Sequence, residues 1–84
     1  MIQRDLENEG GRKYFFVQEY AHEIFDELVD KASEEDAVVK ATAIWDKLSP
    51  YDRKRTERAY LIYAFTEEDG SIDYNTGVVV HTFK

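Results

Sequence analysis

Apolar residues recur at three- and four-residue spacing through the first half of the chain. From about Lys13 to Ala32 the repeating apolar positions are Val17, Tyr20, Ala21, Ile24, Phe25 and Leu28. This spacing places them on one face of an α-helix. The opposite face would then carry Glu19, Glu23, Asp26, Glu27 and Asp30. The pattern predicts an amphipathic helix over about 13–32.

A second apolar stripe follows at once. Its members are Val38, Ala41, Trp45 and Leu48. Ser33 stands where an N-cap belongs, and the acids at 34–36 suit the positive end of the helix dipole. We therefore expect a helix over about 34–48. The short connection to the preceding helix predicts an antiparallel pair of helices.

The residues Ser49-Pro50-Tyr51-Asp52 predict the start of a third helix. Serine is a preferred N-cap, proline is tolerated at the first helical position, and an acid suits the first turn. Proline also disfavours helical geometry at the residue before it, so the second helix must end near Ser49. The sequence predicts that this third helix covers about 50–65.

The apolar end of this segment has a second interpretation. Residues 60–65, YLIYAF, also have high β-propensity, and periodicity cannot separate a helix from a buried strand over so short a run. Residues 78–83 would be the natural partner strand. The predicted fold class is mainly α, a compact three-helix domain with a short C-terminal helix or strand. The alternative is an α+β domain with a hairpin from 59–65 and 78–83.

The length of 84 residues allows one domain, 1–84. Gly10 and Gly11 suit a flexible pair, so residues 1–11 are expected to form an arm. An alternative hairpin would pair residues 2–6 with 12–17 across these glycines.

The charge balance limits the partners of this chain. With 18 acidic against 11 basic residues, the formal net charge is −7. Phosphate backbones would be repelled, so we expect no direct nucleic-acid binding, whereas a basic protein surface would be attracted. No cysteine is present and no apolar run approaches the length of a membrane span. The N-terminus does not resemble a signal peptide, so the expected location is the cytoplasm, with no membrane partner.

Candidate chemical sites are weak. Gly70, Ile72 and Asp73 match part of a calcium loop within 67–76, but the first and last ligand positions would be Phe65 and Thr76, which do not fit. His22 and His81 stand far apart in sequence and without a catalytic motif. We therefore predict no enzyme, no cofactor and no metal, and keep weak calcium binding as an alternative function.

Basic and aromatic residues supply the remaining candidate. The basic cluster around Lys54 stands out in an acidic chain, and it either ties helices together or faces a partner. Tyrosine and arginine are enriched at binding hot spots. The predicted partner-binding residues are Tyr14, Phe15, Tyr51, Lys54, Arg55 and Arg58.

These observations predict a small, acidic, non-enzymatic accessory protein that acts by protein–protein interaction, of the kind that phages and mobile elements encode. A homodimer is compatible with the sequence. The alternative is an inhibitor that imitates nucleic acid with its two rows of carboxylates and acts on restriction, CRISPR or transcription machinery.

Overall fold

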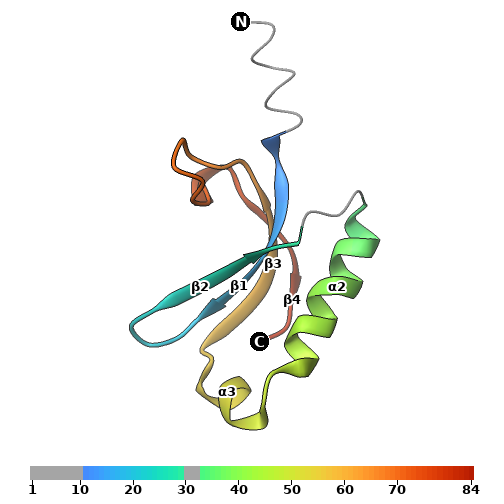
Figure 1. Ribbon diagram of the computed structural model, residues 1–84, viewed down its shortest axis with the longest axis vertical. Helices are drawn as coiled ribbons and strands as arrows, with labels where there is room; N and C mark the ends of the chain where they lie inside the picture. The colour runs from blue at the N-terminus through green and yellow to red at the C-terminus, as the bar shows by residue number, and fades with distance from the viewer. Residues whose placement is uncertain (1–10, 30–32) are drawn as a thin grey trace, which may run out of the picture.

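The structure is a computed structural model that describes residues 11–29 and 33–84. Figure 1 shows a sheet with one long helix lying across it. In chain order the elements are β1 (Lys13–Glu19), β2 (Ile24–Leu28), α2 (Glu34–Lys47), α3 (Pro50–Arg55), β3 (Arg58–Ala64), the 3-10 turn η1 (Tyr74–Thr76) and β4 (Val78–Thr82).

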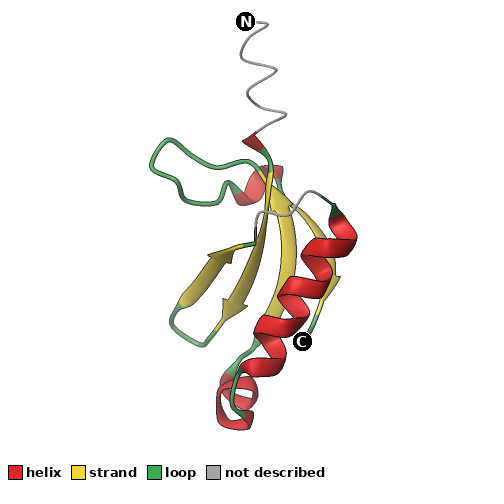
Figure 2. Ribbon diagram, turned by 45° about the vertical axis from the view of Figure 1, so that its right-hand side comes forward, coloured by secondary structure: helices red, strands yellow, loops and turns green. Residues whose placement is uncertain are grey.

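The four strands form one antiparallel sheet in the order β2-β1-β3-β4. β1 and β3 are the central pair, joined along their full length from Lys13 opposite Ala64 to Glu19 opposite Arg58. β2 and β4 are the two outer strands. Helix α2 crosses one face of the sheet, and the connection between β3 and β4 loops out on the other side (Figure 2).

Side chains of the central strands are buried on both faces. On the α2 side, Phe16 and Leu61 pack with Ala37 and Ala41 of the helix. On the other side, Phe15, Val17 and Ile62 pack with Ile72, which comes from the β3–β4 connection. A strand that is buried on both faces loses the alternation of apolar and polar residues that would identify it in a sequence.

The predicted helix over 13–32 is wrong. Its residues form the β1–β2 hairpin, with Phe15 opposite Leu28 and Glu19 opposite Ile24. The chain reverses at residues 20–23, where the Tyr20 amide donates to the Glu23 carbonyl oxygen at 2.8 Å. This turn contains no glycine, proline or asparagine, so the usual turn signal was missing. The apolar residues that matched a helical repeat are divided between a buried strand and an exposed one.

The predicted helix over 50–65 is correct at its start and wrong beyond Arg55. Ser49 accepts a hydrogen bond from the Asp52 amide at 3.1 Å, as expected of an N-cap, and Pro50 begins α3. The helix ends where Thr56 becomes buried, and Arg58–Ala64 continues as strand β3. The alternative hairpin is confirmed, because β3 pairs antiparallel with β4.

The predicted helix over 34–48 is confirmed as α2, and Ser33 caps it by accepting from the Asp36 amide. A mainly α three-helix domain, and the description of the chain as helical, are nevertheless wrong. The fold is α+β, with α2 packed on a sheet rather than on a second helix. Residues 1–10 of the expected arm, and residues 2–6 of the alternative hairpin, lie outside the described residues. Among the residues described, no helix is long and apolar enough to cross a membrane.

Candidate functional site

Strand β2 is an outer strand whose five residues are all exposed. Three of them are large and apolar: Ile24 is 56%, Phe25 52% and Leu28 47% exposed. The remaining two, Asp26 and Glu27, are carboxylates. An edge that combines exposed apolar side chains with a regular, unbulged strand is a typical place for another protein to bind.

A row of aromatic and cationic side chains continues this edge onto α3. The guanidinium of Arg55 lies 5.3 Å from the centre of the Tyr20 ring and 5.5 Å from that of Tyr51. Tyr20 in turn meets Phe25 edge to face, with ring centres 5.5 Å apart. We call Ile24, Phe25 and Leu28, together with Tyr20, Tyr51 and Arg55, the hairpin surface.

The hairpin surface rests on a buried polar contact between β1 and the end of α3. The side-chain amide nitrogen of Gln18, Nε2, donates to the Tyr20 hydroxyl at 2.8 Å and to the Thr56 hydroxyl at 3.1 Å. Thr56, which is 1% exposed, donates its own proton to the Asp52 carbonyl oxygen at 2.7 Å. These bonds fix the end of α3 against the hairpin, and this buried network holds Tyr20 and Arg55 next to each other.

On the face away from α2, carboxylates lie next to tyrosines. The Tyr60 hydroxyl donates to Glu19 at 2.7 Å, and Arg58 pairs with the same carboxylate at 3.7 Å. Burial raises the pKa of the Tyr60 hydroxyl, and the hydrogen bond to Glu19 raises it further. Burial also raises the pKa of Tyr74, with Asp26 and Glu19 adding to the effect. Asp26 and Glu19 therefore place negative charge beside Tyr74 on this face.

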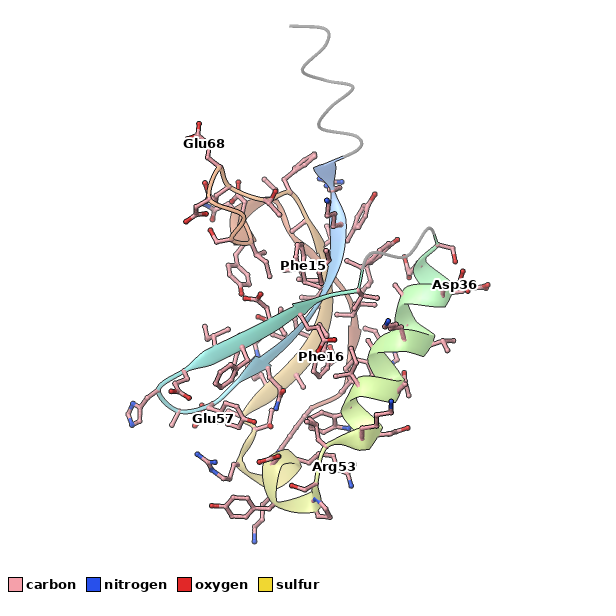
Figure 3. The ribbon with its side chains drawn as sticks, in the orientation of Figure 1. Phe15, Phe16, Asp36, Arg53, Glu57 and Glu68 are labelled. Carbon is pink, nitrogen blue, oxygen red and sulfur yellow. The ribbon has the colours of Figure 1, made fainter. Side chains whose placement is uncertain are left out.

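The basic cluster is divided among several structural roles. Arg53 donates to the carbonyl oxygens of Trp45 and Asp46 at the end of α2, at 3.4 and 3.2 Å. Lys84 donates to the carbonyl oxygens of Arg53 and Lys54. Figure 3 shows Arg53 and Asp36 at opposite ends of α2, so Arg53 is distant from the acids that begin the helix. Within the cluster, Arg58 pairs with the Glu19 carboxylate, whereas Arg53 donates to backbone oxygens, as does Lys84 outside the cluster.

The structure brings some of the predicted partner-binding residues together and separates others. Tyr51 and Arg55 are adjacent and exposed, whereas Arg58 is the first residue of β3 and lies over the Tyr60 ring at 5.2 Å. Tyr14 is half-buried and stacks on Tyr63 on the α2 side. Phe15 is 5% exposed and belongs to the core. Lys54 is exposed on α3.

Sequence reasoning missed Tyr20, Ile24, Phe25 and Leu28 as surface residues. It assigned them to the buried face of a helix, whereas three of them are exposed on β2. The available signal was the β-propensity of the run Tyr14–Val17, which would have converted the helical repeat into a hairpin.

The acidic turn at 67–71 is held by its own hydrogen bonds. Asp69 accepts from the amide and the hydroxyl of Ser71, at 3.0 and 2.7 Å. These bonds lower the pKa of the Asp69 carboxyl. Gly70, with φ of 92°, supplies the left-handed residue of the turn. Among the described residues, no group of three or more His, Cys, Asp or Glu is placed to hold a metal ion. The Asp69 carboxylate is thus engaged by Ser71 within the turn, and calcium binding by residues 67–76 stays a prediction.

Comparison with known protein families, with curated proteins and with solved structures finds no match to this chain.

Proposed function

We propose that this protein is a non-enzymatic accessory protein that binds another protein through the hairpin surface. The observation that carries the proposal is the exposure of Ile24, Phe25 and Leu28 on one outer strand, where Phe25 contacts the Tyr20–Arg55–Tyr51 row. Rigid aromatic side chains beside an arginine are the composition found at binding hot spots. The partner is expected to present a basic surface, because the net charge is −7.

The test begins with mild affinity isolation of the full chain and identification of the proteins it retains. The partner is then purified and its affinity measured by calorimetry for the wild type and for Phe25→Ala and Tyr51→Ala. A hot-spot side chain costs about 2 kcal/mol or more when truncated, so affinity should fall by about thirtyfold.

Val39→Ala is the matched control. Val39 is a single apolar residue that is 69% exposed on α2, away from the hairpin surface. It should leave affinity unchanged. Recovery of no specific partner, or equal affinities for Phe25→Ala and Val39→Ala, would refute the proposal.

A second candidate is favoured by the charge of the hairpin. Residues 14–30 contain five acids and no lysine or arginine. We expected two carboxylate rows on two helices. The acids of the first expected row that the structure describes lie on the β1–β2 hairpin, where Asp26 and Glu27 are exposed on opposite faces of the outer strand. A partner that normally holds nucleic acid on a basic surface would be attracted by this hairpin, and the protein would then act as an inhibitor by occupying that surface.

This candidate is tested by competition. The purified partner is loaded with its nucleic acid, and this protein is added at increasing concentration while anisotropy reports the bound nucleic acid. Displacement that weakens as salt rises is the expected result, because exposed charges are screened. Formation of a ternary complex without displacement would exclude mimicry and leave simple protein binding.

A further inference from the structure

Among residues 11–29 and 33–84, β2 pairs with β1 alone, and the register of the hairpin defines which of its backbone groups lie on the outer edge. At one end the Tyr20 amide donates to the Glu23 carbonyl oxygen, and at the other the Val29 amide donates to the Tyr14 carbonyl oxygen. Residues of an antiparallel strand alternate between bonding to a neighbour and facing away from it. Between these two bonded pairs, Phe25 and Glu27 therefore direct their amide and carbonyl groups toward β1. The amide and carbonyl groups of Ile24, Asp26 and Leu28 face outward, away from β1.

The same alternation sorts the β2 side chains between the two faces of the sheet. Ile24, Asp26 and Leu28 share the face of Phe15 and Val17, which is the face away from α2. Phe25 and Glu27 share the face of Phe16, toward α2. A strand added at this edge would place alternate side chains on the two faces of the sheet. One row would lie on the face of Asp26, and the other would lie on the face that α2 covers.

The space beside α2 accepts apolar side chains. A groove of about 590 Å³ lies between β2 and α2, lined by Glu27, Lys40, Ala43, Ile44, Lys47 and Leu48. Its charged residues include two lysines and one glutamate, so this side offers no net attraction to a cation. Ala43, Ile44 and Leu48 supply the apolar surface that an incoming side chain would contact.

The opposite face attracts a cation. Asp26 makes no ion pair with any described residue, and its charge together with that of Glu19 already raises the pKa of Tyr74. Glu19 is engaged by Tyr60 and Arg58. Asp26 thus has no cationic partner among the described residues, and a basic side chain of an added strand that stood opposite it would provide one.

A second copy of this chain is a poor occupant of the edge. In the fully overlapped antiparallel register, Asp26 would stand opposite Asp26 of the copy, and like charges directly opposite destabilise strand pairs. The other outer strand, β4, carries a register shift opposite Leu61 and Ile62, a device that discourages strand addition.

We propose that β2 receives an extended segment of a partner protein as a fifth, antiparallel strand, and that this segment alternates basic and apolar residues. Its basic residues lie opposite Ile24, Asp26 and Leu28, on the side of the carboxylates. Its apolar residues enter the groove beside α2. This inference rests on the proposed function, since it names the part of the partner that the hairpin surface binds.

The first probe is a synthetic seven-residue peptide of alternating lysine and valine with blocked ends. It is titrated into the full-length protein labelled with ¹⁵N. Amide shifts should concentrate at Ile24, Asp26 and Leu28. The same peptide with glutamate in place of lysine should cause no shifts. Shifts spread over the sheet, or centred on α3, would overturn the proposal.

Two backbone-modified peptides separate strand addition from simple charge attraction. Methylating the lysine amides removes the hydrogen bonds to the outward groups of β2, and affinity should fall by about tenfold or more, as expected for losing several such bonds. Methylating the valine amides leaves those bonds in place and should change affinity little. Equal affinity for the two peptides would show that no strand is added.

A protein variant provides the reciprocal test. Asp26→Pro removes an outward amide without removing a bond to β1, whereas Asp26→Asn removes the charge and keeps the amide. Both should weaken peptide binding, Asp26→Pro the more strongly. If Asp26→Pro does not fold, the methylated peptides alone decide the matter. The remaining outcome is that a partner recovered by affinity isolation binds both variants with the affinity it has for the wild type. That result would refute strand addition and leave the proposed function intact.

Discussion

At the scale of single residues, Thr56 connects α3 to the sheet. Its hydroxyl accepts from Gln18 and donates to the Asp52 carbonyl oxygen, at a position that is 1% exposed. The sequence indicates none of this, because a threonine inside a predicted helix is ordinary and its partner Gln18 is distant in the chain. Contacts between residues so far apart depend on topology, which local pattern does not specify.

Replacing Thr56 by valine keeps the volume and removes both hydrogen bonds. We expect Thr56→Val to lower the free energy of unfolding by about 1–3 kcal/mol, because buried partners are left unsatisfied. Urea unfolding followed by circular dichroism measures the change. Thr82→Val, on the exposed edge of β4, should change it by less than about 0.5 kcal/mol. Equal effects of the two variants would contradict the role assigned to Thr56.

Tyr60 predicts a loss of stability at alkaline pH. Its pKa is raised in the folded state, so the folded protein holds this proton more tightly than the unfolded chain does. The associated stability is present below about pH 10, the usual pKa of tyrosine, and is lost as the pH rises above it. Tyr60→Phe should reduce that alkaline loss while costing about 1 kcal/mol at neutral pH through the lost bond to Glu19.

Urea unfolding of wild type and Tyr60→Phe at neutral and alkaline pH checks this expectation. Tyr51→Phe is the control, since Tyr51 is 67% exposed on α3. An alkaline decline that is identical in all three proteins would show that Tyr60 contributes nothing to it.

At the scale of elements, local signals located helix boundaries well and strands poorly. Ser33 and Ser49 cap α2 and α3 as their sequences predict, because an N-cap depends on three or four neighbouring residues. β1 was missed because its side chains are buried on both faces, so its apolar run resembles a helix core. β3 was recognised as an alternative because YLIYAF had a visible partner in 78–83. Neither a helix cap nor a recognisable partner strand indicated that β2 would be an exposed edge strand.

The β3–β4 connection packs closely enough to exclude a methyl group at Gly77. A Cβ there would overlap the Ile62 side chain, meeting Cδ1 directly and lying 2.9 Å from Cγ1. We expect Gly77→Ala to destabilise the fold by about 1–3 kcal/mol through overpacking. Thermal or urea unfolding measures it.

Removing the obstructing atom should relieve part of that cost. Ile62→Val deletes Cδ1 and alone costs about 0.5–1.5 kcal/mol. The double variant Gly77→Ala/Ile62→Val should therefore be more stable than the sum of the single effects predicts. Strict additivity would mean that the two residues do not meet as described.

At the scale of the whole molecule, a sheet with two outer strands has to avoid joining other sheets. β4 has its register shift, and β2 has Asp26 and Glu27. The net charge of −7 adds repulsion between copies. We expect these acids to limit self-association while leaving the edge open to a basic strand.

Neutralising the edge should therefore increase self-association. Asp26→Asn/Glu27→Gln removes the like-charge contact between the two Asp26 residues, worth about 0.2–1 kcal/mol, and also the repulsion from Glu27 on the same edge, so dimerisation should strengthen severalfold. Sedimentation velocity measures it. Glu67→Gln/Glu68→Gln changes the net charge equally at the exposed turn and should have a smaller effect. If the two double variants associate alike, net charge rather than edge pairing controls association.

The pairing of Phe15 with Ile62 across the central strands also bears on how the chain folds during its synthesis. The β1–β2 hairpin leaves the ribosome early, whereas β3, which covers the other side of β1, follows after α2 and α3. Throughout that interval β1 has an uncovered edge and two apolar faces. Transiently exposed strand edges of this kind promote aggregation. Slowing translation between α2 and β3 should therefore lower the soluble yield more than slowing it before β1.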